Sequence, residues 1–247
     1  QKENMRLQQY RFSYGKKEIL HLEDMEIPQE SVIAVTGHNG AGKSTLGNAL
    51  MGNPVYTLDG GKIIFEGQDL TGESTDKRAR AGMFLSFQNP IEVPGITLGN
   101  FIRTALEQRT GKRIRLWEFK KELKKAMEVL QMDESYAERD LNVGFSGGEK
   151  KKAEILQLLM LRPSLAILDE TDSGLDVDAV RTVSRGVEEY QKDKNGALLI
   201  ITHSTRILEA LKVDRTHVLA DGRMVASGDS SLVDEINENG FEKYTEQ

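Results

Sequence analysis

Short, nearly continuous apolar runs alternate along the chain with segments whose apolar residues recur every three or four positions. Strands that are covered on both faces have such runs, and strands that alternate with helices form parallel sheets. The runs that we interpret as buried strands span residues 31–36, 83–87, 165–169 and 197–202. Their order predicts an α/β fold built around a parallel sheet with crossover helices.

Two further parts of the chain have the pattern of antiparallel strands joined by tight turns. Asp221-Gly222 is a two-residue sequence typical of a β-hairpin, and Gly15-Lys16-Lys17 makes a similar break near the N-terminus. The strand-like segments that flank these turns are residues 5–14, 19–27, 216–220 and 223–226. We therefore expect a mixed sheet with antiparallel strands at its edges.

Between about residues 97 and 141 the strand pattern is missing and helical periodicity replaces it. Apolar residues recur there at the spacing of one helix face, namely Leu116, Phe119, Leu123, Met127 and Leu130. We expect a core formed by residues 1–89 and 142–247, with a helical lobe, residues 90–141, inserted into it. Trp117 is predicted to pack inside this lobe because tryptophan is highly buried on average.

The charge pattern limits the classes of protein. A net charge of −6 argues against a broad nucleic-acid-binding surface, which needs clustered positive charge. Basic residues at 112, 113 and 115 and lysines at 120, 121, 124 and 125 are interspersed with glutamates, so we interpret them as a solvated helix face. No apolar run approaches the roughly 20 residues that cross a bilayer.

The chain contains no cysteine, which excludes disulfides and thiolate metal sites. The N-terminal residues are polar and charged through Gln9, without the apolar centre of a secretion signal. We expect a cytoplasmic protein that does not insert into a membrane. Because Gln1 is not an initiator methionine, a plastid-type organelle is the alternative if a targeting segment is missing upstream.

One segment has the chemistry of a phosphate-binding loop, and it lies between the predicted strand at 31–36 and an apolar-periodic stretch at 46–51. Glycines let the backbone curl until successive N–H groups point at phosphate oxygens. The segment consists of Gly37, His38, Asn39, Gly40, Ala41, Gly42, Lys43, Ser44 and Thr45. A strand before this pattern and a helix after it indicate a nucleotide site.

The helix after this loop adds ligands for a triphosphate and its metal. Its N-terminus presents unpaired N–H groups and the positive end of the helix dipole. Lys43 can reach the β- and γ-phosphates, and the hydroxyl of Ser44 suits Mg²⁺. The loop is therefore predicted to hold a nucleoside triphosphate together with Mg²⁺.

Asp169 and Glu170 follow the apolar run that ends at Leu168, so an expected strand delivers two carboxylates at its carboxyl end. Open α/β sheets bind their ligands at that edge. Consecutive strand side chains point to opposite sides, so the two carboxylates should have different tasks. One is suited to holding Mg²⁺ and the other to orienting or deprotonating an attacking water.

His203 follows another predicted strand, again at the carboxyl edge if that strand runs parallel to the others. An imidazole at this edge could contact a γ-phosphate, so we interpret His203 as functional. The sequence assigns no chemistry to His21, His38 or His217, because they lack such a setting.

Ser146-Gly147-Gly148 precedes a strongly helical run, so Ser146 is predicted to cap that helix while the glycines leave its first N–H groups accessible. A helix end of this kind is a second anion-binding terminus. We expect it to face the nucleotide of another copy of the chain.

The order of these motifs resembles that of ABC-type ATPases, with Gln88 after the second strand and Ser173-Gly174-Leu175-Asp176 after the carboxylates. Within them the chain resembles the SufC family, the ATPase subunits of the Suf iron–sulfur cluster assembly machinery, over essentially its whole length. The segments that carry this likeness are residues 87–95, 142–151 and 169–176. The resemblance implies an α/β P-loop NTPase fold of ABC ATPase type.

The chain departs from the usual transporter ATPase pattern at a few positions. Phe145 replaces a leucine, Glu149 replaces a glutamine, and Thr171-Asp172 stand where proline and threonine are common. The SufC family shares these departures, so they favour that family over transporter subunits.

The resemblance implies a Mg²⁺-dependent ATPase in which most motifs have a role. Lys43 and Ser44 would hold phosphate and Mg²⁺. Gln88 would contact the metal and sense a partner, and Asp169 would support Mg²⁺. Glu170 would position the attacking water.

Other residues would complete the ATP site. His203 would touch the γ-phosphate, so that Lys43, Glu170 and His203 are the expected catalytic residues. Residues 146–148 of one copy would close over ATP bound to a second copy, with Asp176 helping to couple the two sites. An aromatic side chain stacks on adenine in this family, and we favour Tyr14 for that role over packing in the core.

The expected function is ATP hydrolysis that drives conformational change in SufB/SufD-type scaffold proteins, with ATP-dependent head-to-tail pairing of two copies. A chain without cysteine lacks ligands for a cluster of its own. One alternative is the ATPase subunit of an ABC membrane transporter. Another is a nucleotide-dependent binding module without turnover, which the carboxylate of Glu170 argues against.

Overall fold

A six-stranded sheet with the order β13-β12-β4-β11-β10-β7 forms the centre of the computed structural model, which describes residues 3–37, 43–86, 92–169, 176–192 and 196–245. Neighbours from β12 to β7 run parallel, and β13 pairs antiparallel with β12. The predicted parallel sheet and C-terminal hairpin are confirmed. The strands are β4 (Val32–Thr36), β7 (Met83–Ser86), β10 (Leu165–Asp169), β11 (Ala197–Ile201), β12 (Arg215–Ala220) and β13 (Arg223–Gly228).

The N-terminal antiparallel strands form a second sheet with the order β2-β1-β5-β6, and β3 also pairs with β1. The segment expected to be one strand at 19–27 is interrupted at Glu23 and Asp24, polar residues that separate β2 from β3. The strands are β1 (Glu3–Tyr14), β2 (Lys17–Leu22), β3 (Met25–Pro28), β5 (Thr57–Phe65) and β6 (Gln68–Asp69). The fold is thus α/β with both parallel and antiparallel strands.

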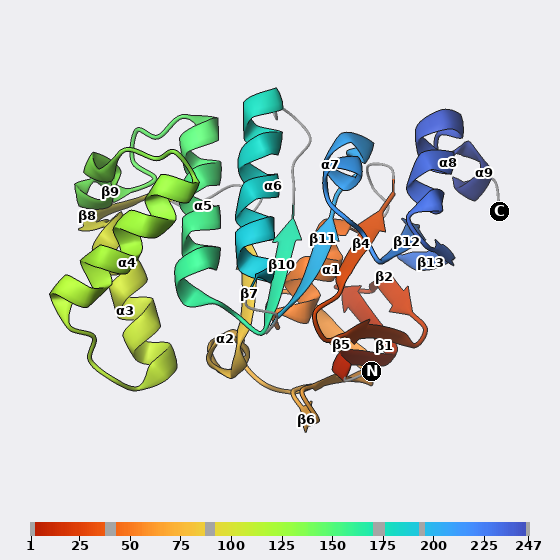
Figure 1. The fold of residues 1–247 in the computed structure, drawn as a ribbon. Helices are drawn as coiled ribbons and strands as arrows, with labels where there is room; N and C mark the ends of the chain where they lie inside the picture. The colour runs from red at the N-terminus through yellow and green to blue at the C-terminus, as the bar shows by residue number, and fades with distance from the viewer. Residues whose placement is uncertain (1–2, 38–42, 87–91, 170–175, 193–195, 246–247) are drawn as a thin grey trace.

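Each face of the central sheet has its own apolar core, because successive strand residues point to opposite faces. Val32 and Ala34 pack in the core beneath α5 (Gly147–Leu161), α6 (Val177–Gln191) and α7 (Thr205–Ala210). Ile33 and Val35 pack in the core shared with α1 (Lys43–Leu50) and the second sheet. Figure 1 shows α5 and α6 in front of the sheet and α1 behind it.

The helical lobe lies beside α5 at one end of the molecule (Figure 1). It comprises β8 (Val93–Thr97), α3 (Leu98–Thr110), α4 (Leu116–Val129), the 3-10 helix η1 (Glu134–Glu138) and β9 (Asp140–Leu141), and β8 pairs with β9. Phe119, Leu123, Met127 and Leu130 are buried, as the helical spacing predicts. Leu116, in the first turn of α4, was expected on the same face but is 49% exposed. The remaining helices are α2 (Thr75–Ala81), α8 (Ser231–Asn239) and α9 (Glu242–Thr245).

The prediction that Trp117 packs inside the lobe is wrong, since its side chain is 63% exposed. Trp117 lies in the first turn of α4, away from the face that carries Phe119 and Leu123. Helical periodicity places that face against the core and leaves position 117 outside it.

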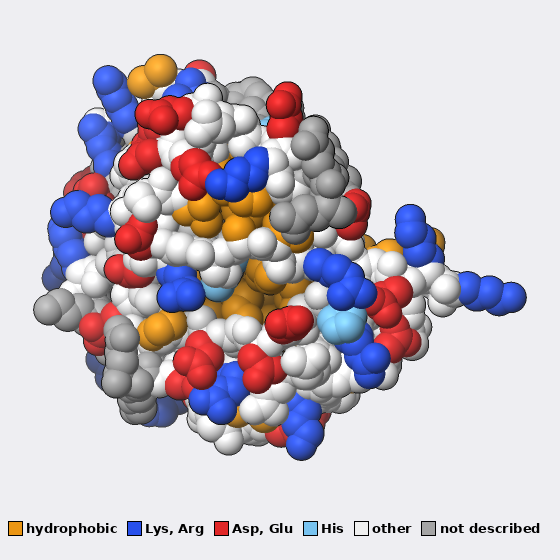
Figure 2. All heavy atoms as spheres, turned by 90° about the vertical axis from the view of Figure 1, so that its right-hand side faces the viewer, with side chains coloured by type: hydrophobic (Ala, Val, Ile, Leu, Met, Phe, Trp, Pro, Cys, Tyr) orange, Lys and Arg blue, Asp and Glu red, His pale blue; other side chains and the backbone are white. Residues whose placement is uncertain are grey.

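The face that carries the C-terminal helices has acidic and basic side chains interspersed, as Figure 2 shows. Within the described ranges, no helix is both long enough and apolar enough to span a bilayer.

Candidate functional site

Helix α1 packs closely on the sheet, and Gly47 allows this approach. A Cβ atom at Gly47 would lie 3.3 Å from Cδ1 of Leu85 and 3.5 Å from Cδ1 of Ile201. Both residues stand at the carboxyl halves of their strands, β7 and β11. The N-terminus of α1, which begins with Lys43, therefore lies at the edge where open α/β sheets bind ligands.

Three candidate residues at this edge influence one another electrostatically. Burial lowers the pKa of Lys43 to about 8, and the carboxylate of Asp169 offsets part of this effect. Burial also lowers the pKa of His203, and the charge of Lys43 lowers it further. Side chains from α1, from β10 and from the segment after β11 thus lie near enough to influence one another, and the neutral form of the imidazole is favoured there.

Asp169 ends β10 and is only 7% exposed. Its backbone N–H donates a 3.2 Å hydrogen bond to Oγ of Ser86, the last residue of β7. Ser86 is not among the site residues predicted from the sequence, because its only signal is its place two residues before Gln88. This bond joins β10, which ends at Asp169, to β7, the strand that precedes Gln88 in the sequence.

Several predicted site residues lie outside the described ranges, namely Asn39, Gly40, Ala41, Gly42, Gln88 and Glu170. Of the other loop residues, Gly37 is buried at the end of β4, and Thr45 is half-buried in the first turn of α1. Ser44 belongs to the same turn.

The segment Ser146-Gly147-Gly148 begins α5 with a capping box. Oγ of Ser146 accepts a 3.2 Å hydrogen bond from the N–H of Glu149, and the Glu149 carboxylate accepts a 2.9 Å bond from the N–H of Ser146. The predicted helix cap is confirmed. A Cβ at Gly147 or Gly148 would meet no atom within 4 Å, so this helix end is open to an approaching molecule.

Asp176 and Tyr14 occupy separate parts of the fold. Asp176 caps α6 by accepting a 2.8 Å hydrogen bond from the N–H of Ala179. Tyr14 is 59% exposed at the end of β1, and its ring lies 6.3 Å from that of Tyr56. The buried Tyr10 on the same strand is not accessible to a ligand, whereas Tyr14 is.

An apolar groove of about 560 Å³ separates α1 and α2 from α3 and α5. Residues of β7 form its floor, and Ser86 lies among its lining residues. Met51 and Ala79 line one wall, while Phe101 and Leu161 line the other. The groove therefore extends from the helical lobe to the residue that bonds Asp169.

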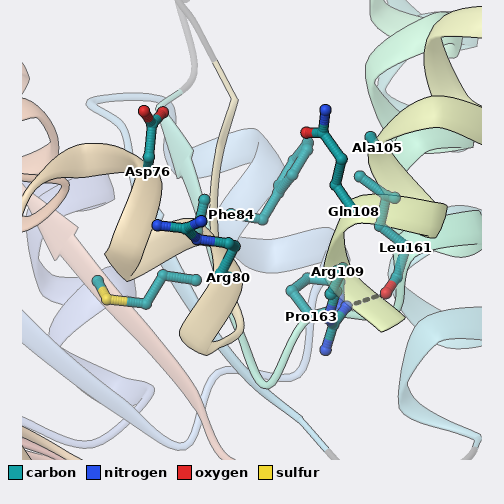
Figure 3. Close-up of a pocket in the computed structure, with 10 residues that line it drawn as sticks. Asp76, Arg80, Phe84, Ala105, Gln108, Arg109, Leu161 and Pro163 are labelled. Carbon is teal, nitrogen blue, oxygen red and sulfur yellow. Dashed lines mark hydrogen bonds between the residues drawn. The ribbon is translucent and has the colours of Figure 1, made fainter. Parts of the chain in front are cut away.

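The groove adjoins a second cavity of about 530 Å³, since Met83, Phe84 and Leu161 line both. Figure 3 shows this cavity between Arg80 of α2 and Arg109 of α3. Arg109 donates a hydrogen bond to the carbonyl of Leu161, and burial lowers the pKa of its guanidinium. The groove thus combines an apolar floor with an end that carries two arginines.

Comparisons with known proteins agree with this architecture. A family model described as ABC transporter matches residues 20–173. The "Probable ATP-dependent transporter SufC" of Escherichia coli is 41% identical over 95% of this chain and 96% of its own length. A "Probable ATP-dependent transporter" of Synechocystis is 43% identical over 95% of this chain and 93% of its own length.

A solved structure titled "Dimeric Structure of MJ0796, a Bacterial ABC Transporter Cassette" has the same fold, with a TM-score of 0.77 at 16% identity over 92% of this chain and 98% of that one. The matched family segment covers more than half of the sequence, and the relatives match nearly all of it. The chain therefore belongs to the ABC transporter family, as an ATPase of the SufC type.

Proposed function

We propose that the chain hydrolyses ATP to drive conformational change in a SufB/SufD-type scaffold during iron–sulfur cluster assembly. The observation that carries this proposal is the apolar groove, which extends from the lobe to Ser86 and through it to Asp169. A scaffold helix seated in the groove would touch the same strand end that supports the nucleotide site. The likeness to the relative named SufC supports the choice of scaffold.

Cluster chemistry would take place on the partner. The chain has no cysteine, and cysteine thiolates are the usual ligands of iron–sulfur clusters. Its contribution would be mechanical, because ATP binding and product release alter the surface that the scaffold contacts.

The described residues fit ATP with Mg²⁺. A buried carboxylate at Asp169 is a ligand of the type that Mg²⁺ takes, and Lys43 at the start of α1 is placed for the phosphates. Ser44, Gln88 and Asp169 would hold the metal, which neutralises charge on the phosphates when bound.

The hydrolytic roles follow from the same chemistry. Glu170 would position the attacking water, and Lys43 would stabilise charge on the phosphates. His203 would donate to the γ-phosphate through an imidazole N–H. Tyr14, exposed beside Tyr56, would stack on the adenine.

A second copy would complete each site. Ser146, Gly147 and Gly148 are exposed and lead into the N–H groups that open α5, which suits them to an anion from outside the chain. We propose a head-to-tail pair in which this segment covers ATP bound to the partner copy, with Asp176 near the junction. Gln88 would couple formation of this pair to the shape of the groove.

A transporter subunit is the alternative function, because the relatives carry the word transporter in their names and an apolar groove also suits a helix of a membrane partner. The two functions differ in the identity of the partner. Purification of the tagged chain under anaerobic conditions, with mass spectrometry of bound proteins, distinguishes them.

The expected result is a scaffold that carries iron–sulfur clusters. A polytopic membrane protein in its place would refute the proposal in favour of the transporter. Ala79→Arg fills the groove with a charged side chain and should release the scaffold, whereas Ala210→Arg, an exposed change at the end of α7, should not.

A further inference from the structure

Arg78 is a buried arginine on α2, 3% exposed, and among the described residues it forms no ion pair with a carboxylate. Its guanidinium donates to four main-chain carbonyls. Nη1 lies 2.6 Å from the oxygen of Leu50 and 3.2 Å from that of Ala49. Nη2 donates to the carbonyl of Thr71 at 3.0 Å, and Nε donates to that of Glu73 at 3.1 Å.

Two of these acceptors are the last carbonyls of α1. The final carbonyls of a helix lack partners within the helix and lie at the negative end of its dipole. The planar fork of Arg78 supplies both the donors and the positive charge that this helix end requires. The hydroxyl of Tyr10 also donates to the Ala49 carbonyl, at 3.4 Å.

A second contact joins the same two helices. The hydroxyl of Thr75, in the first turn of α2, donates a 3.2 Å hydrogen bond to the carbonyl of Gly52, just after α1. Space around this junction is tight, because a Cβ at Gly52 would lie 3.0 Å from Nε of Arg78. The end of α1 and helix α2 are therefore held as one body.

Helix α2 lines the groove next to α1, which contributes Asn48. Thr75 and Ala79 line the groove, and Asp76 and Arg80 line the adjoining cavity (Figure 3). Arg78, from the same helix, reaches the C-terminal end of α1. Helix α1 has eight residues and is about 12 Å long, and Lys43 stands at its opposite end.

We propose that Arg78 is a positioning residue that couples the groove to the phosphate end of α1. A partner that displaces α2 would move α1 with it, and a nucleotide bound at the start of α1 would change α2 in return, because coupling between two sites is reciprocal. The identity of the partner rests on the proposed function. The link between α1 and α2 does not.

Hydrogen–deuterium exchange on the full chain, with and without MgADP, tests this coupling. In the wild type, MgADP should slow exchange in both α1 and α2, by about fivefold or more in α2. Arg78→Lys keeps the charge but replaces the fork with one ammonium group, which cannot satisfy four carbonyls. It should reduce the α2 response below about twofold while α1 remains protected.

Lys77→Arg is the matched control, since Lys77 neighbours Arg78 on α2 but is exposed and pairs with Glu73. It should keep the wild-type response. An equal α2 response in Arg78→Lys and the wild type would overturn the proposal. So would a wild-type α2 that does not respond to MgADP.

Two further readouts separate coupling from general destabilisation. A purely structural loss would speed exchange throughout the chain, so β10 serves as an internal reference and, without nucleotide, should exchange in Arg78→Lys at the wild-type rate. If Arg78→Lys does not fold, Thr75→Val removes the second contact from an exposed position and should lower the α2 response by at least about twofold. An unchanged response in this variant would then refute the coupling.

The nucleotide experiment needs no scaffold. Its failure would leave the copurification result intact, and failure of the scaffold to copurify would leave the α1–α2 coupling measurable. The two proposals can therefore fail separately.

Discussion

Nucleotide binding should take up a proton at Lys43 in mildly alkaline solution. Burial lowers the pKa of Lys43 to about 8, from an ordinary value of 10.5. A phosphate bound next to the ammonium group favours its charged form and raises the pKa again. Because the bound state has the higher pKa, binding draws in protons, and affinity falls as the pH rises through about 8.

The size of the effect follows from the pKa. With a value of about 8, about half of the Lys43 side chains are charged at pH 8 and about a tenth at pH 9. MgADP binding should therefore take up about 0.5 proton at pH 8 and about 0.9 proton at pH 9. Between pH 9 and pH 10 the affinity should drop by up to about tenfold.

Calorimetric titration at fixed pH in two buffers of different ionisation enthalpy measures this uptake. Burial and the charge of Lys43 lower the pKa of the His203 imidazole, so its charged form is disfavoured before the nucleotide binds. Lys43→Arg keeps a cation that does not titrate in this range and should abolish the uptake. An uptake below about 0.1 proton at pH 9 in the wild type would refute either the lowered pKa or the contact with phosphate.

Three further predictions use substitutions. Glu170→Gln should retain ATP and accumulate the paired state in sedimentation, and hydrolysis at the wild-type rate would show that another residue positions the water. Ser146→Ala removes the cap of α5 and should lower the free energy of unfolding by about 1 kcal/mol, with a loss of ATPase activity at high protein concentration. A Cβ at Gly186 would overlap Cγ2 of Ile155. Gly186→Ala should therefore cost about 1–3 kcal/mol in denaturant unfolding, whereas Gly72→Ala, with no atom within 4 Å of the added Cβ, should leave stability nearly unchanged.

The sequence predicted those features whose causes are local. Apolar runs identified the buried parallel strands, and Asp221-Gly222 identified the hairpin because both residues adopt positive φ, 48° and 75°. Ser146 and Glu149 stand at capping-box spacing, so the start of α5 was readable from neighbouring residues alone.

Features that depend on distant contacts were not predictable. Nothing near Arg78 in the sequence indicates that its partners are carbonyls at the end of α1, and the bond between Ser86 and Asp169 joins residues 83 positions apart. Trp117 is a residue type that is usually buried, but its position on α4 lies outside the helix face that packs on the core. The structure brings Lys43 near Asp169 and His203.

Other expectations remain predictions. They include the roles of the site residues, the division into core and lobe, and the cytoplasmic location. The phosphate-loop residues 38–42, Gln88 and Glu170 lie outside the described ranges. Their chemistry rests on the pattern of residue types and on the family.

Among the residues that the structure describes, the helical lobe has no separate hydrophobic core and shares one with α5 and the central sheet. Leu98, Ile102 and Phe119 belong to the same cluster as Leu156 of α5 and Ala34 of the sheet. Deletion of residues 93–141 would expose the apolar side chains of α5 that now face the lobe. The remaining fragment should therefore be prone to aggregation. A chimera that takes its lobe from a related ATPase would also need the facing side of α5 from that ATPase. Each of these two surfaces is buried only by the other.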